Sequence, residues 1–268
     1  MKRFNLIMAS ALLTAGLIFS SCGSVALTGR KQLLLVSDQE VYQAGLTQYN
    51  EYIASSQLSS NSKNTALVKN VGQKLAAATE QYLRNSGLES ELQNFAWEFN
   101  LVKDEQVNAF CMPGGKIVVY EGLLTVAQTE AELAVVIGHE IAHAVAKHSN
   151  ERMSQQMMAQ YGAAILSQAL SQKSAAIQQT ASTVFGLGAQ VGLMLPYSRK
   201  HEYEADYMGI VFMELAGYDS TSSLDFWTKM SAGGSGGSDF LSTHPSDTKR
   251  IAELKRRIPE AKQIAQSM

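Results

Sequence analysis

Two histidines and a glutamate fall within five consecutive residues, His139-Glu140-Ile141-Ala142-His143. In a helix, residues four apart lie about 40° apart on one face, so both imidazoles can reach a single ion. Neutral imidazole is a good zinc ligand, and Glu140 lies beside the pair, where it could take a proton from a water molecule on the metal. The spacing predicts a site for one Zn²⁺ per chain, with Glu140 as the general base.

Two simpler interpretations of the same residues stay open at this point. The histidines could be hydrogen-bonded core residues, or they could belong to a purely structural metal site. A structural zinc site is normally closed by four ligands, usually including cysteine, and it needs no base beside them. The chain has only 5 histidines, so this spacing is seldom expected by chance, and we favour a catalytic site.

A catalytic zinc needs a third protein ligand and an open position, and residues 198–206, SRKHEYEAD, can supply that ligand. If this segment is helical, Glu202 and Asp206 share one face. Glu202 can then bind the metal while Asp206 accepts the free N–H of an imidazole. Glu204 points about 200° away and is expected to be solvated or salt-bridged. Without the upstream histidine pair, this charged segment would indicate an ordinary solvated helix face.

Two further roles at the site have candidate residues. Arg199 or His201 could donate a hydrogen bond to the oxyanion of the transition state, although Arg199 could equally pair with a carboxylate. His244 follows a glycine-rich loop and precedes Pro245. We expect this loop to let His244 swing into the open position as a fourth ligand and hold the enzyme latent. The alternative is an ordinary surface histidine.

Helices must position these residues, and the apolar periodicity predicts them. The histidine pair lies in a predicted helix over residues 129–148, with Thr129 as its cap. Further helices are expected over residues 38–55 and 63–85, and a final basic helix over 247–257 is expected to end at Pro259. Alternating apolar residues between 95 and 120 predict a small sheet.

Two other segments have distinctive compositions. Residues 161–195 contain a single charge, Lys173, but their recurrent glutamines favour amphipathic helices or a mobile flap over a cleft rather than a membrane span. Residues 231–238, SAGGSGGS, predict a flexible loop.

The bulk composition indicates one globular domain. Of the 268 residues, 46% are hydrophobic and 17% are charged, which is enough apolar material for one sizeable core. The formal charge is -2, and no long run of one sign indicates a nucleic-acid partner. We expect an α+β, mainly α-helical fold with the domain at residues 37–258 and a C-terminal tail at 259–268.

The N-terminus indicates export. Lys2 and Arg3 precede an apolar stretch at residues 6–19, followed by Ser20-Ser21-Cys22. This pattern is typical of a signal peptide over residues 1–21, with a lipobox whose Cys22 becomes lipidated. Phe19 stands where such signals usually have leucine, which leaves ordinary cleavage or an uncleaved anchor open. We expect a lipid-anchored N-terminal arm at residues 22–36, on the periplasmic face of a bacterial envelope membrane. Only Cys111 then keeps a free thiol, so no intramolecular disulfide is expected.

The histidine motif together with residues 198–206 resembles the HtpX-like and CAAX-prenyl-protease-like zinc metallopeptidase family. Residues 108–115 and 122–124, and His244-Pro245 with Arg250-Ile251, are similar to further motifs of that family. The likeness covers about residues 30–257, and it is closest to the periplasmic single-domain lipoproteins of the family.

The resemblance implies a gluzincin-like domain with a small β-sheet beside the zinc helix. It implies hydrolysis of peptide bonds by a metal-activated water. By position, the metal ligands would be His139, His143 and Glu202. Glu140 would be the base, and Asp206 would support an imidazole.

The expected substrates are polypeptides, specifically unfolded or misassembled envelope proteins. Residues 116–120, if they form an edge strand beside the zinc helix, could pair with an extended peptide through main-chain hydrogen bonds. Two rivals are a non-catalytic, zinc-stapled periplasmic holdase or assembly-factor lipoprotein, and an interaction lipoprotein with a vestigial site. Glu140 argues against both, because neither needs a base beside the metal.

Overall fold

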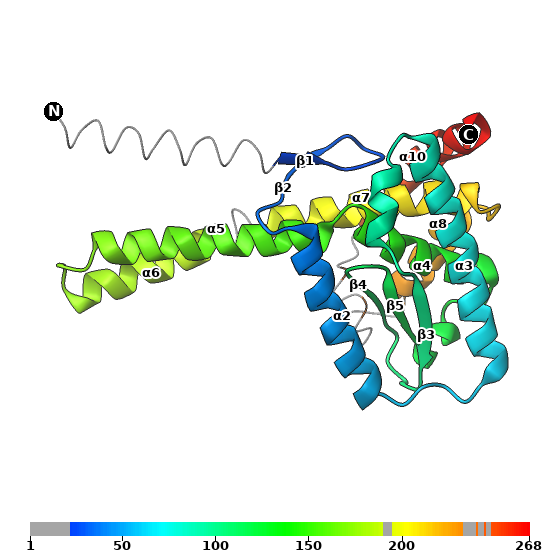
Figure 1. The fold of residues 1–268 in the computed structure, drawn as a ribbon, viewed down its shortest axis with the longest axis horizontal. Helices are drawn as coiled ribbons and strands as arrows, with labels where there is room; N and C mark the ends of the chain where they lie inside the picture. The colour runs from blue at the N-terminus through cyan, green and yellow to red at the C-terminus, as the bar shows by residue number, and fades with distance from the viewer. Residues whose placement is uncertain (1–21, 190–194, 233–239, 241–243, 245–247) are drawn as a thin grey trace.

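The computed structural model describes residues 22–189, 195–232, 240, 244 and 248–268 (Figure 1). Helices make up most of this part of the chain, and a three-stranded sheet and a two-stranded hairpin complete it. The expected α+β, mainly α-helical fold is therefore confirmed. Among the described residues, no helix combines the length and apolarity needed to cross a bilayer. The predicted signal peptide and residues 233–238 of the predicted flexible loop lie outside the described residues.

The small sheet has the order β3-β5-β4. Strand β5 (Lys116–Tyr120) runs parallel to β3 (Glu98–Val102) and antiparallel to β4 (Ala109–Met112). The expectation that residues 116–120 form an edge strand is wrong, because β5 is hydrogen-bonded on both sides. A tight turn reverses the chain from β4 to β5 at Gly114 and Gly115, whose φ angles are 88° and 80°. The edge strand that packs against the zinc-motif helix is β4.

Helices cover both faces of the sheet. Helix α2 (Asp38–Ser55) begins with a capping box between Ser37 and Glu40 and packs Tyr49 against one face of the sheet. Helices α3 (Ser62–Asn85) and α4 (Glu130–Val145) cover the other face, where the main core lies. Helix α4 carries the histidine motif and is buried along nearly its whole length.

Helix α7 (Leu195–Leu215) packs against α4 at a pair of glycines. A Cβ atom added to Gly138 would lie 3.1 Å from the carbonyl oxygen of Gly209. A Cβ atom added to Gly209 would lie 3.0 Å from the backbone nitrogen of His139. The two backbones therefore touch directly beside the first histidine. Since Glu202 and Asp206 lie on the same face of α7 as Gly209, this contact brings their carboxylates to the histidines.

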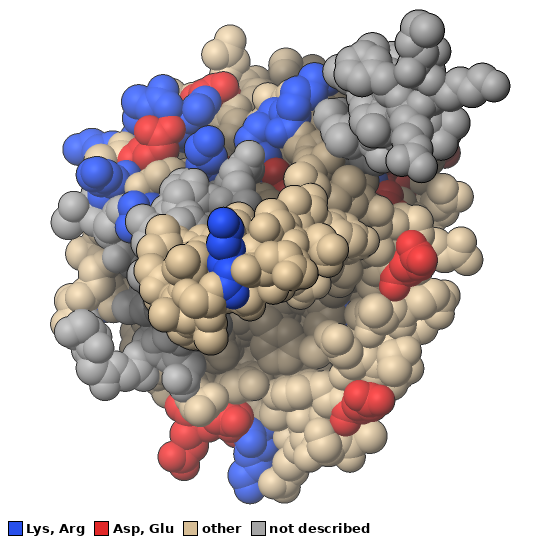
Figure 2. All heavy atoms as spheres, turned by 90° about the vertical axis from the view of Figure 1, so that its left-hand side faces the viewer, with Lys and Arg blue, Asp and Glu red and all other residues tan. Residues whose placement is uncertain are grey.

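Helices α5 (His148–Ala169) and α6 (Ala175–Ala189) pair into a hairpin that extends away from the rest of the fold (Figure 1). The helical prediction for this region is confirmed, but the hairpin projects outward rather than closing over the fold. It exposes several large apolar side chains, and Figure 2, which looks onto this side, shows a surface with little charge. The exposed large apolar residues on the hairpin are Met153, Met158, Tyr161, Ile165, Ile177 and Val184.

The two C-terminal helices pack against each other, and the earlier one also packs against α4 while the later one packs against α7. Helix α8 (Ser222–Ala232) carries the buried Trp227, and α10 (Thr248–Ser267) runs through Pro259. The expectation that the helix ends at Pro259 is wrong. Proline removes one helical hydrogen bond, but burial of Ile258 and Ala261 on either side of Pro259 keeps this stretch packed as a helix.

Four short elements complete the described fold. In the N-terminal arm, β1 (Cys22–Ser24) pairs with β2 (Lys31–Leu33), and β2 packs on α5. Two 3₁₀ helices, η1 (Glu89–Asn94) and η2 (Glu121–Thr125), precede β3 and α4 respectively. The arm therefore reaches the base of the helical hairpin, close to the end of α4.

Candidate metal centre

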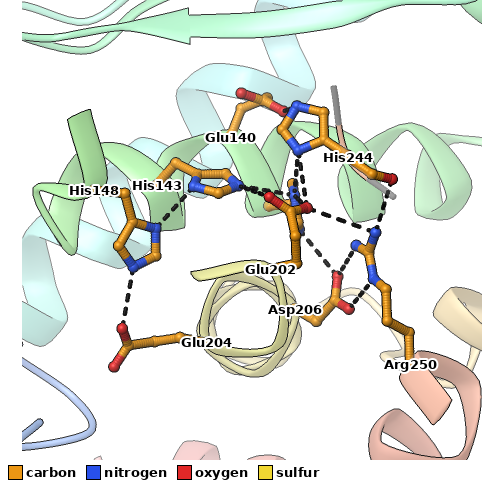
Figure 3. Close-up of polar contacts among 9 residues, drawn as sticks. Glu140, His143, His148, Glu202, Glu204, Asp206, His244 and Arg250 are labelled. Atoms are coloured by element: carbon orange, nitrogen blue, oxygen red, sulfur yellow. Dashed lines mark hydrogen bonds and ion pairs between the residues drawn. The ribbon is translucent and has the colours of Figure 1, made fainter. Parts of the chain in front are cut away.

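Four buried side chains from three parts of the chain converge on one point (Figure 3). His139 and His143 come from α4, Glu202 comes from α7, and His244 lies between α8 and α10. One ligand atom from each of the four residues lies within 4.8 Å of the others. The three predicted ligands and the predicted fourth residue are therefore brought together.

The atoms that meet at this point are nitrogens and oxygens with lone pairs. The Nε2 atoms of His139 and His143 are 3.0 Å apart. The carboxylate of Glu202 lies 3.3 Å from Nε2 of His139 and 3.5 Å from Nε2 of His143. The Nδ1 atom of His244 lies 3.2 Å from Nε2 of His139 and 3.0 Å from Glu202.

A carboxylate fixes the orientation of His139. Its Nδ1 atom is 3.0 Å from Oδ1 of Asp206, as the helical spacing of Glu202 and Asp206 predicts. Arg250 of α10 donates two hydrogen bonds of 2.7 Å to Asp206 and one of 3.2 Å to the backbone carbonyl of His244. Because an arginine-paired carboxylate only accepts, His139 donates from Nδ1, so Nε2 is the nitrogen that can offer a lone pair to a metal.

These residues fit a metal ion. The lone pairs of His139, His143 and Glu202 face one another, which is unfavourable unless a cation lies among them. The Oε1 atom of Glu202 is buried, and no hydrogen-bond donor reaches it in the described structure. Two imidazoles and a carboxylate are a ligand set typical of catalytic zinc. The donor set therefore suits a divalent cation of this kind.

The electrostatics of the cluster also favour positive charge. Burial disfavours the charged form of His139, but hydrogen bonds to Asp206 and Glu202 outweigh burial and raise its pKa to about 9. Burial alone would raise the pKa of Glu202, but hydrogen bonds with His139 and His244 lower it well below the ordinary value. The carboxylates thus remain ionised and stabilise a cation between the side chains.

Glu140 lies at the edge of the cluster, beside His244 in Figure 3. Its Oε1 atom is 3.5 Å from Nε2 of His244. Burial raises the pKa of Glu140, while the positive charges of the neighbouring imidazoles and a hydrogen bond from the Cys111 backbone partly oppose burial. A carboxylate with a raised pKa is suited to take up a proton near neutral pH. The contact with Cys111 also places edge strand β4 directly at this carboxylate.

The other predicted residues have different surroundings. Glu204 is buried and salt-bridged, with its carboxylate bonded to His148 and Arg30. His201 is fully buried and bonds Glu151 at 2.9 Å, which leaves it away from the reacting centre. Arg199 is an exposed side chain near the start of α7. Its role as a transition-state donor stays a prediction.

The sequence interpretation missed a second layer of residues around the ligands. His148 lies behind His143, and Arg30 reaches the same region from the N-terminal arm. The sequence analysis named Arg250 only as part of a motif similar to that of the family and assigned it no role, but it bonds Asp206. His148 follows His143 by five residues, and this spacing only weakly indicates a contact between the two imidazoles. No local pattern indicates a role for Arg30, because its carboxylate partners lie more than a hundred positions away.

A pocket opens beside the cluster between α2, β4 and the end of α4. His143 lines one side, and Cys111, Met112 and Tyr42 line others. Burial raises the pKa of the Cys111 thiol well above its usual value, so this cysteine is a lining residue rather than a nucleophile. The pocket continues the edge of β4, and both apolar and polar residues line it.

Comparison with known proteins identifies relatives of the chain. Peptidase family M48 matches residues 63–258. The mitochondrial metalloendopeptidase OMA1 of Schizosaccharomyces pombe is 31% identical over 278 residues, which cover 97% of this chain and 74% of that protein. The Arabidopsis thaliana protein of the same name is 41% identical over 60% of this chain and 31% of its own length. A putative beta-barrel assembly-enhancing protease of Vibrio cholerae is 31% identical over 59% of this chain and 34% of its own length.

Proposed function

This chain belongs to peptidase family M48, and from that premise we propose that it is a zinc-dependent endopeptidase that cuts unfolded or misassembled proteins of the cell envelope. One observation carries the proposal: a ligand set of two histidines and a glutamate lies beside a separate buried carboxylate, Glu140. A structural metal site has no use for that carboxylate. Edge strand β4 lies at the same point, where a peptide could be held.

We assign the zinc ligands to His139, His143 and Glu202. A bound zinc ion would supply a Lewis acid that polarises the scissile carbonyl and lowers the pKa of water. Glu140 takes the proton of the attacking water and delivers it to the leaving nitrogen, a role that its burial and raised pKa support. Asp206 and Arg250 hold the His139 ring so that its Nε2 lone pair points inward.

We further assign His244 to the fourth position of the site in a latent state. Its Nδ1 atom lies among the ligand atoms of the cluster, and its ring stacks on Phe240 with 4.5 Å between ring centroids. A substrate must displace His244 to reach the centre. The residues on either side of His244 lie outside the described part of the chain.

The position of β4 supports the proposed substrate class. Its outer edge is unpaired among the described strands, and its Cys111 backbone contacts Glu140. An extended polypeptide pairing there would place its main chain at the candidate base, largely without regard to sequence. A site that binds any extended main chain suits unfolded proteins as substrates. The name of the Vibrio cholerae relative supports clients among envelope proteins.

We place the protein at the periplasmic face of an envelope membrane, anchored by lipid at Cys22. The support is the basic, apolar and small-residue pattern of residues 1–22. Cys22 begins β1, so a lipid there would hold the arm, and through β2 the base of the α5–α6 hairpin, close to the membrane surface.

A cleavage assay tests the proposed function. The purified chain should degrade an unfolded protein such as casein, and a zinc chelator should abolish this activity. Restoring zinc should restore cleavage, whereas Glu140→Gln should remain inactive with zinc present. A zinc-loaded protein that prevents aggregation of unfolded proteins but cuts none of them would favour the holdase alternative.

A further inference from the structure

A hydrogen-bonded line of side chains connects the N-terminal arm to His143, and Figure 3 shows its part from His143 through His148 to Glu204. The Nδ1 atom of His148 is 2.8 Å from Nδ1 of His143, and the Nε2 atom of His148 is 3.0 Å from Oε2 of Glu204. The Nε atom of Arg30 donates to the same carboxylate at 2.7 Å. None of these three residues contributes a ligand atom or a base, so the proposed mechanism leaves them without a role.

The direction of the hydrogen bonds follows from what each group can do. Arg30 can only donate, and Thr28 donates to the other oxygen, so both oxygens of Glu204 act as acceptors. His148 must then donate from Nε2, which leaves a lone pair on its Nδ1 atom. That lone pair can accept a hydrogen bond only if His143 carries its proton on Nδ1. In this tautomer the Nε2 atom of His143 keeps its lone pair toward the metal position.

The residues of this line are buried and held from several sides. The side chains of His148 and Glu204 are 0% and 6% exposed. Thr28 donates to the second oxygen of Glu204, and Arg30 also makes a two-pronged pair with Glu151 at 2.9 and 2.7 Å. Burial makes such contacts strong and poorly tolerant of loss, because each unpaired group would remain out of water.

The geometry points to a positioning relay made of Arg30, Glu204 and His148, which fixes the tautomer and orientation of His143 and so sets the affinity of the metal site. This inference rests on the proposed zinc site. The relay mirrors the support of His139, where Asp206 and Arg250 make the corresponding contacts. Arg30, the outermost member of the relay, belongs to the segment of the arm that links β1 to β2. Packing of this segment against the rest of the fold is therefore a condition for tight metal binding.

Substitutions at His148 test the relay in the full chain. His148→Leu removes the acceptor for His143 and should raise the zinc dissociation constant roughly 10- to 100-fold, measured by competition with a chelator. His148→Asn keeps an oxygen near the position of Nδ1 and should recover most of the affinity. In cobalt-loaded protein, the visible absorption bands should shift for His148→Leu and stay close to those of the unsubstituted chain for His148→Asn.

His201 offers a matched control. It is as fully buried as His148, its ring stacks on that of His148 at 4.1 Å, and its Nε2 atom bonds Glu151. His201→Leu should lower the unfolding temperature but leave zinc affinity within about threefold and the cobalt bands unchanged. Equal loss of zinc affinity in both leucine variants would overturn the relay and reduce His148 to a packing residue.

Arg30→Gln decides the question if His148→Leu does not fold. Arg30 is partly exposed, with 23% of its side chain accessible, so this variant is expected to fold. It should bind zinc roughly 3- to 10-fold more weakly, because Glu204 loses the guanidinium donor that holds it in place as the acceptor for His148. Unchanged zinc affinity would overturn the relay. If the unsubstituted chain itself bound no zinc or cut no protein, the proposed function would fail instead.

Discussion

The Nε2 atoms of His139 and His143 lie 3.0 Å apart, although hydrogen bonds at both Nδ1 atoms leave each Nε2 with a lone pair. Two lone pairs at this distance repel unless a cation lies close to both. The carboxylate of Glu202 adds negative charge at the same place. The fold therefore holds these groups in an arrangement that favours a positive charge between them, and metal binding should stabilise the packing of α4 against α7.

Glu140→Gln should keep zinc and lose hydrolysis. The amide preserves the size of the side chain but cannot take a proton, so cleavage of an unfolded protein should fall by about 100-fold or more. Zinc content by elemental analysis should stay near one ion per chain. Glu130→Gln, an exposed residue at the start of the same helix, is the control and should cut normally. Undiminished cleavage by Glu140→Gln would mean that another group is the base.

Glu202→Ala should weaken zinc binding more than Glu204→Ala. The first change removes a ligand and should raise the zinc dissociation constant by at least about 100-fold. The second removes one support of His143 and should raise it by about 10-fold. Chelator competition on both variants gives the ranking. The reverse ranking would move the third ligand to Glu204.

Cys22→Ser should release the protein from membranes. The thiol is the only group that the predicted lipobox offers for acylation. Detergent partitioning and the mass of the N-terminal peptide, compared between the two forms expressed in a bacterium, provide the measurement. A variant that stays membrane-bound with an unchanged N-terminal mass would show that residues 6–19 are themselves the anchor.

His244→Ala should raise basal proteolysis without lowering zinc content. The change empties the fourth position, so substrate no longer has to displace an imidazole. The rate of casein cleavage by equal amounts of zinc-loaded protein measures the effect, and a rise of several-fold is expected. The double variant with Glu140→Gln should be inactive, which assigns the added cleavage to this site. Unchanged or reduced activity would return His244 to a structural role.

The free energy of unfolding should fall in acid, because protonation of Glu151 removes a stabilising contribution. Burial alone would raise its pKa, but hydrogen bonds from His201 and Arg30 outweigh burial and lower it to about 2 from 4.5. A carboxyl whose pKa is lower when folded stabilises the fold above its unfolded pKa. That contribution, on the order of 3 kcal/mol, is lost as pH falls from about 4.5 through about 2.

Urea unfolding of the chain and of Glu151→Gln between pH 2 and 6 measures this contribution. The unsubstituted chain should lose more unfolding free energy than the variant over this range. Glu51→Gln, at an exposed position of α2, serves as the control and should follow the unsubstituted chain. Parallel curves for the chain and for Glu151→Gln would contradict the assignment.

Local periodicity was enough to predict much of the helical frame and part of the metal site. His139 and His143 share a face because they are four residues apart in one helix, and Glu202 and Asp206 share a face for the same reason. The cap at Thr129 and the helix over residues 38–55 also follow from short-range chemistry and match the structure. These features depend on residues within a few positions of one another.

Other features depended on contacts that no local pattern encodes. Residues 116–120 have the composition of a strand, but only pairing with β3 and β4 makes β5 central. Pro259 predicts a helix end, but burial of Ile258 and Ala261 in the folded chain continues the helix past it. In both cases tertiary packing prevailed over the local preference.

The candidate metal centre also combines features that local sequence predicts with features that only the folded chain sets. The sequence by itself determined which side chains the proposed site uses, because ligand type and helical spacing are local properties. Only the tertiary structure decided that α4 and α7 touch at Gly138 and Gly209, and that Arg30 reaches Glu204 from 174 positions away. The physical reason is that buried contacts between distant segments form only when the whole core packs, since they must offset the entropy of ordering the chain between them.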